Sequence, residues 1–142
     1  MLFRSRTVAV PIFVNRTSQP AVEGFITQAV VQAFAANGRL RVVDPKDADA
    51  ILEGELVGYI VTAIAFNPNE NITAYRLILT MNLRFRDVRR NTLLFQEVGL
   101  QEQADFRAQG QVSQTIASET TVVNQAAAEI ARTVVSLAVE RF

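Results

Sequence analysis

The chain lacks the side chains on which most enzymatic nucleophiles, general bases and transition-metal sites depend. Its 142 residues include neither Cys nor His. That composition excludes thiol nucleophiles, Cys/His zinc sites, disulfides and every triad that uses imidazole as its base. The sequence also has no glycine-rich phosphate loop and no Gly-x-Ser-x-Gly motif. Chemistry could therefore come only from carboxylates, hydroxyls and guanidinium groups.

The acidic residues do not form a pattern typical of a catalytic or metal site. Asp44, Asp47 and Asp49 share one polar turn, but their spacing lacks the pattern of a calcium loop, so we predict a solvated turn. Glu53 and Glu55 lie two residues apart on a predicted strand, where cross-strand arginines such as Arg76 or Arg84 are the expected partners. A hydrolase would need two such acids close together in a deep pocket. We expect a non-enzymatic chain with no catalytic residue, no metal and no cofactor.

The strongest chemical feature is basic. Four arginines gather at the end of a predicted strand and in the turn after it, and Arg76 lies on the same strand face. Guanidinium groups bind phosphate and carboxylate through paired hydrogen bonds, so these side chains are candidates for binding an anionic ligand or partner. The alternative is a charged surface that prevents unwanted sheet pairing. The candidate residues are Arg76, Arg84, Arg86, Arg89 and Arg90.

The charge balance argues against nucleic acid as the ligand. Lys plus Arg and Asp plus Glu both number 14, which gives a formal net charge of zero. The arginine face also has no interleaved aromatic side chains on which bases could stack. No apolar run approaches the roughly 18 residues of a membrane span, so we expect none.

The elements that must position the arginines can be predicted from local patterns. Apolar residues at three- and four-residue steps predict two amphipathic helices, and Asn37-Gly38 is a typical helix stop. Pro11 predicts an edge position or an irregularity in the first strand, and Asn15, Thr17 or Ser18 could cap the helix that follows. The predicted strands are 8–14, 39–43, 50–66, about 72–86 and 92–103, and the predicted helices are 20–36 and 113–141, with 104–112 as a loop.

The fourth strand shows which face of the sheet is buried. Tyr75, Leu77, Leu79, Met81, Leu83 and Phe85 share one parity, whereas Arg76, Thr80, Asn82, Arg84 and Arg86 share the other. In the third strand, Leu52, Leu56, Ile60, Ile64 and Phe66 are expected on one side. Both long strands exceed what a small domain needs, so either they are broken or their hairpin projects. A bulge is plausible in the fifth strand, near Leu93-Leu94-Phe95.

These elements predict one α+β domain spanning residues 1–142. The order strand, helix, short strand, three-strand meander and long helix fits a two-layer sandwich. We expect two helices packed on one face of a four- to five-stranded, mainly antiparallel sheet. The first two strands should be parallel, because a right-handed crossover joins them. The polar face, with Glu53 and Glu55, is expected to stay open.

Three segments, in order, resemble a known family. The opening strand 8–17 reads VAVPIFVNRT, residues 38–56 contain GRLRVV and then ADAILEGEL, and 74–77 reads AYRL before a long strand. This set, which covers roughly residues 7 to 104, is similar to LptE, the lipopolysaccharide-assembly lipoprotein family. The resemblance implies a domain that plugs the lumen of an LptD-like outer-membrane β-barrel, contacts lipopolysaccharide and faces the periplasm. It also implies a lipid anchor on an N-terminal Cys, which this sequence does not contain.

A second group of proteins shares part of the same pattern. A VAVxxFxN strand followed by a helix and a VVD…ADAxLEGE segment also resembles CsgG-like and penicillin-binding-protein-activator lipoproteins. That resemblance implies a ring-forming secretion component or an enzyme activator. Co-purification with a large barrel would favour the first reading, and a ring oligomer would favour the second.

Overall fold

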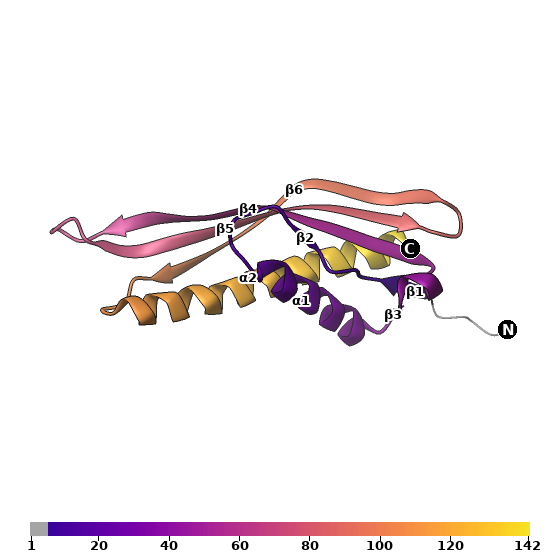
Figure 1. Cartoon of the computed structure of the whole chain (residues 1–142), viewed down its shortest axis with the longest axis horizontal. Coiled ribbons are helices and arrows are strands. Elements are labelled where there is room, and N and C mark those ends of the chain that lie inside the picture. The colour runs from indigo at the N-terminus through magenta and orange to yellow at the C-terminus, as the bar shows by residue number, and fades with distance from the viewer. Residues whose placement is uncertain (1–5) are drawn as a thin grey trace.

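The protein is an open sheet covered on one side by two helices, as Figure 1 shows. The computed structural model describes residues 6–142. The strand order is β3-β1-β4-β5-β6, with β2 paired to β4. This arrangement confirms the predicted α+β sandwich. The elements are β1 (Arg6–Ala9), β2 (Val14–Asn15), α1 (Val22–Asn37), β3 (Leu40–Val42), η1 (Pro45–Asp47), β4 (Ala50–Phe66), β5 (Ile72–Asp87), β6 (Thr92–Arg107) and α2 (Val112–Arg141).

The sheet is mixed, which corrects the prediction of a mainly antiparallel one. β4, β5 and β6 form the expected antiparallel meander. β1 and β3 pair in parallel as predicted, because α1 carries the chain back in a crossover. The correction comes from β1 and β2, which both also run parallel to β4. β1 therefore lies between two parallel neighbours.

The first predicted strand is broken at Pro11. β1 ends at Ala9 and β2 begins at Val14, so residues 10–13 leave the sheet, as a residue without an N–H predicts. In this break the Phe13 amide donates to Thr27 Oγ1 of α1 at 3.0 Å. The Phe13 ring packs onto Gly54 of β4 so closely that a Cβ there would lie 2.8 Å from the ring. The break thus ties α1 to the sheet.

The start of α1 differs from the prediction, and its end confirms it. Ala21 at the N-cap has a φ of 71° and makes no side-chain capping bond. Asn15 instead donates to the Gln19 carbonyl at 2.7 Å and to Glu23 at 2.8 Å, so its side chain organises the preceding loop. At the other end Gly38, with a φ of 78°, donates its amide to the Phe34 carbonyl.

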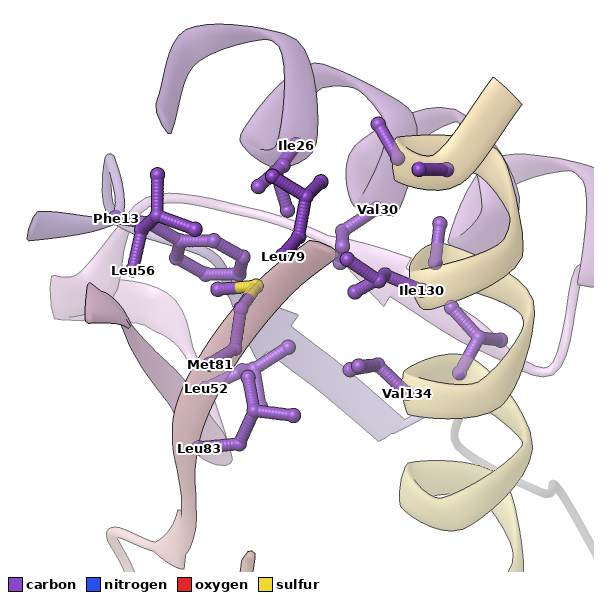
Figure 2. Close-up of a cluster of buried hydrophobic side chains, with 14 of the residues drawn as sticks. Phe13, Ile26, Val30, Leu52, Leu56, Leu79, Met81, Leu83, Ile130 and Val134 are labelled. Carbon is purple, nitrogen blue, oxygen red and sulfur yellow. The ribbon is translucent and has the colours of Figure 1, made fainter. Parts of the chain in front are cut away.

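The core lies between the inner face of the sheet, which the helices cover, and the two helices (Figure 2). The predicted apolar parity of β5 is confirmed: its inner side chains are buried from Leu77 to Phe85, and Tyr75 is half-buried. Ile26 and Val30 of α1 and Ile130 and Val134 of α2 meet them. Buried aliphatic side chains of this kind supply most of a small domain's stability.

The helix α2 is long and apolar enough to cross a membrane by composition alone, which the sequence reading did not anticipate. Half of the relevant stretch is buried inside the protein, where Ala126, Ala127 and Ala131 pack closely. Its hydropathy is therefore that of a core helix that covers the sheet.

Two β-bulges change which residues of β4 face the core. The register with β5 shifts at Val57 and again at Ile64. Because each bulge adds one unpaired residue, Ile60 lies opposite Ile78 on the outer, uncovered face and is 55% exposed. The prediction that Ile60 and Ile64 continue the side of Leu52 and Leu56 is therefore wrong.

β6 is longer than predicted and irregular as predicted. It runs to Arg107, so the expected loop over 104–112 is wrong up to that residue. Phe106 explains the extension, because its buried ring stacks on Tyr75 of β5 with the centroids 5.3 Å apart. The plausible bulge near residues 93–95 is confirmed by the register shift between Phe85 and Arg86 of β5.

The long strands make two projecting hairpins. The β4–β5 hairpin extends past the start of α2 at one end, and the β5–β6 turn extends at the other (Figure 1). The sequence predicted that these strands either are broken or form a projecting hairpin. Both are observed, because bulges interrupt strands that also project.

Candidate anion-binding surface

Arg76 lies on the outer face of β5 and is already paired. It is in register with Asp105 of β6, and the two side chains form a fork with Nε–Oδ1 at 2.8 Å and Nη2–Oδ2 at 3.2 Å. The hydrogen bond to Asp105, followed by the charge of Asp105, raises the pKa of Arg76. The hydrogen bond from Arg76 lowers the pKa of Asp105. The charge of Arg76 is therefore balanced within the sheet.

Arg84 and Arg86 lie further along the same face, at the end nearest the β5–β6 turn. Arg86 makes a 3.8 Å contact with Glu53. Arg84 stands in register between Glu53 and Gln96, and no carboxylate of the described residues 6–142 lies within ion-pair distance of it. Glu53 therefore pairs with a cross-strand arginine as predicted, but the partner is Arg86 and not Arg76 or Arg84, the two that the sequence suggested.

Arg89 and Arg90 occupy the β5–β6 turn. Arg89 forms an ion pair with Asp49, and the Arg90 amide donates to Asp87 Oδ1 at 3.0 Å. The Arg90 side chain is exposed and has no ion pair within the part of the chain that the structure describes. The backbone bond to the buried Asp87 fixes the turn, so the Arg90 guanidinium extends from a rigid base.

The five arginines form one group and one outlier. Eight residues separate Arg76 from Arg84, which corresponds to about 26 Å of strand at roughly 3.3 Å per residue. Arg84 and Arg86 lie near the end of strand β5, and Arg89 and Arg90 lie in the turn that follows it; we call these four the turn-end cluster. In this cluster, the guanidinium groups of Arg84 and Arg90 form no ion pair with a carboxylate of residues 6–142.

Asp49 is structural, so the prediction of a wholly solvated acidic turn is wrong at this residue. Its carboxylate accepts the Thr7 amide at 3.0 Å, and its own amide donates to Thr7 Oγ1 at 3.0 Å. Burial alone would raise the pKa of Asp49, but the bonds from Thr7 and Arg89 together hold it below the ordinary value. Asp44 and Asp47 are exposed, as predicted.

The sequence pattern did not predict the partner of Glu55 on the outer face. Glu55 pairs with Arg16 of the loop before α1, at 3.4 Å, and not with an arginine of β5. No strand pattern could show that, because Arg16 reaches the sheet only through the break at Pro11. Across residues 6–142, no three acidic side chains converge as metal ligands would.

Comparison with known proteins identifies the fold and the family. Solved structures with this fold include a putative lipoprotein from Caulobacter crescentus (TM-score 0.62, 13% identity, 91% of this chain and 89% of that one). A minor lipoprotein from Acinetobacter baumannii is similar (TM-score 0.61, 13% identity, 95% of this chain and 91% of that one). The PelC dodecamer from Paraburkholderia phytofirmans is also similar (TM-score 0.56, 14% identity, 92% of this chain and 90% of that one). No curated protein sequence matches.

At such low identities these structures establish the fold alone. The family model for LptE, described as lipopolysaccharide assembly, matches residues 5–137, nearly the whole chain. This chain therefore belongs to the LptE lipopolysaccharide-assembly family.

Proposed function

We propose that this protein is a non-catalytic plug and support for an LptD-like outer-membrane β-barrel. In this proposal it works on the periplasmic side, held by a lipid on an N-terminal Cys that lies outside this sequence. The observation that carries the proposal is the two-sided sheet: α1 and α2 cover the inner face, and no element of the described residues 6–142 covers the outer face (Figure 1). Family membership supplies the context of lipopolysaccharide assembly.

The outer face has the chemistry that a water-filled barrel lumen requires. Most of its side chains are polar, with Thr80 opposite Gln101 at its centre, and the neighbouring pair Ile60 and Ile78 is apolar. The interior of a wide membrane barrel is polar and hydrated, so a plug gains most from hydrogen-bonding groups on a rigid support. The buried core beneath β5 provides that rigidity.

The experiment is purification of the tagged, full-length lipoprotein from the outer membranes of its own organism under mild detergent. We expect one large β-barrel to co-purify in a one-to-one ratio. A variant with Leu79→Ala, which weakens the core and leaves the outer face unchanged, is the control for folding. Recovery of the protein without any barrel partner would refute the plug role.

We also propose that the turn-end cluster binds the phosphates of lipopolysaccharide. Arg84 and Arg90 supply guanidinium groups that pair with no carboxylate of residues 6–142, and Arg86 and Arg89 are weaker donors because a carboxylate already partly neutralises each of them. Arg76 already donates two hydrogen bonds to the Asp105 carboxylate, so its contribution to phosphate binding should be smaller. Paired bonds from guanidinium to phosphate suit this arrangement.

Charge reversal tests the proposed contact with lipopolysaccharide. Arg84→Glu together with Arg90→Glu should weaken lipopolysaccharide binding, and reversal of all four cluster residues should weaken it further. The matched control is Arg39→Glu with Arg41→Glu, which reverses the same number of exposed charges near β3, outside the cluster. Binding that is unchanged by the cluster variants, or weakened equally by the control, would contradict the proposal.

A second candidate is a ring-forming envelope component. The structural likeness to PelC, which is a dodecamer, favours it, with 92% of this chain covered. In that case the purified chain alone should have the mass of a closed ring of many copies. A barrel complex containing one copy of this chain would exclude it.

A further inference from the structure

The outer half of β4 is an open sheet edge. β2 pairs with β4 only at Glu55 and Leu56, and the last bond on that side is from the Arg16 amide to the Leu56 carbonyl at 2.9 Å. From Val57 to Phe66, β4 pairs with β5 on one side, and no described strand lies on the other. Backbone amides and carbonyls along such an edge can accept another strand.

The edge of β6 at the opposite side of the sheet is protected in the usual ways. β6 contains Glu97, Glu102, Asp105 and Arg107, and Gly99 with a φ of 77° interrupts it, held by Asn82 at 2.9 Å. Charges and bulges at an edge discourage pairing with another chain.

The open edge of β4 has no such charge. From Leu56 to Tyr75 the only charged residue is Glu70, in the loop at the hairpin tip. The two bulges at Val57 and Ile64 bound an unbroken stretch, Gly58 to Ala63, without Pro or charge. Ile60 on the outer face is 55% exposed, and Val61 on the inner face is 36% exposed. Apolar side chains are thus available on both faces beside a free edge.

These properties limit what can cover the edge. Hydrocarbon cannot satisfy backbone amides and carbonyls, so a lipid phase is a poor occupant. A β-strand satisfies them and also packs against both faces. A strand of like sequence meets no charge repulsion here, because the stretch is uncharged.

We infer that a second copy of this chain pairs antiparallel with the first along Gly58 to Ala63. A two-fold axis at Val61 places Tyr59 opposite the partner's Ala63 and Ile60 opposite the partner's Thr62. Large side chains then face smaller ones, and Val61 faces its own counterpart. The Tyr59 hydroxyl donates to Glu119 of α2, so its ring is already fixed in position for this contact.

The predicted dimer is weak. A stretch of about six residues buries well below the roughly 1,200 Å² of a stable interface, so micromolar dissociation is expected. Because the axis is two-fold, association closes at two copies and builds no ring. The inference does not depend on the barrel partner.

The test is sedimentation equilibrium of the purified chain across a hundredfold concentration range. The wild type should pass from monomer to dimer, and Val61→Lys should stay monomeric, because a charge on the edge blocks pairing. Val98→Lys is the matched control, since Val98 is 73% exposed on the β6 edge strand and should leave the dimer intact. A wild type that stays monomeric, a dimer that persists in Val61→Lys, or a larger oligomer would overturn the inference.

A disulfide experiment reports the register without relying on mass alone. The chain has no Cys, so Val61→Cys introduces a single thiol. At a two-fold axis, opposite Cα atoms lie about 4.5–5.5 Å apart, within disulfide range. Mild oxidation should cross-link Val61→Cys at least tenfold faster than Val98→Cys. Equal rates would refute this register, and with it the proposed pairing.

Discussion

The packing of Phe13 onto Gly54 is the contact whose disruption tests the fold most sharply. Phe13 is 2% exposed and lies beside Leu56 and Met81 beneath α1 (Figure 2). A Cβ at Gly54 would come within 2.8–2.9 Å of three ring carbons, closer than real Cβ atoms approach other atoms. Gly54→Ala must therefore displace a fully packed ring.

The expected cost follows from this displacement. Overpacking a filled core costs about 1–3 kcal/mol of unfolding free energy. For a domain of this size that corresponds to a fall in Tm of about 3–10 °C. The assay is urea unfolding followed by circular dichroism, with thermal melting as a second measurement.

A second glycine provides a control for which the expected change in stability has the opposite sign. Gly24 lies in α1, and a Cβ there meets nothing within 4 Å. Gly24→Ala should therefore raise stability by about 0.5 kcal/mol through helix propensity. Gly54→Ala combined with Phe13→Leu should cost less than the two single changes added together, because the smaller side chain relieves the clash. Gly54→Ala as stable as the wild type, or strict additivity, would refute the reasoning.

Two further predictions concern stability. The folded protein holds the pKa of Asp49 below its ordinary value of 3.8, so the contribution of this carboxylate to folding stability is complete above that pH and is lost as the pH falls through the folded pKa. Between about pH 5 and pH 2 the Tm of the wild type should therefore fall more steeply than that of Asp49→Asn. Parallel curves would disprove the role of Asp49. Leu79→Ala on the buried inner face should cost about 2–5 kcal/mol, whereas Ile60→Ala, 55% exposed on the outer face, should cost less than about 1 kcal/mol; equal costs in urea unfolding would mean that the two faces are misassigned.

Local sequence pattern predicted the layers of this fold well. Alternation from Tyr75 to Phe85, broken only at Ile78, identified the covered face, because every second side chain of a strand points the same way. Gly38 marked the end of α1 through its left-handed backbone. Pro11 marked the break between β1 and β2, since it cannot donate to a ladder.

The pattern was insufficient where one residue changes the register. The bulge at Val57 moves Ile60 to the outer face, and nothing in the alternation shows which residue is unpaired. The extension of β6 depends on Phe106 meeting Tyr75, a contact between residues distant in the chain. Parallel pairing of β1 with β4 likewise depends on tertiary packing.

The candidate site was predicted only as a set of residue types. The sequence placed Arg76, Arg84 and Arg86 on one strand face correctly. It could not show that Arg76 pairs with Asp105 or that Arg89 pairs with Asp49. Ion pairs between strands depend on register, and register depends on the bulges. The free guanidinium groups of Arg84 and Arg90 could be recognised only from the structure.

The most direct test of the docking role is the accessibility of the outer face in the assembled complex. Gln101→Cys places a single thiol at an exposed outer position of β6 in a chain without Cys. Labelling by a water-soluble maleimide, counted on this chain by mass spectrometry, should be fast for the free protein. We predict labelling at least tenfold slower in the barrel complex. An equal rate in both states would show that this face is not where the partner lies.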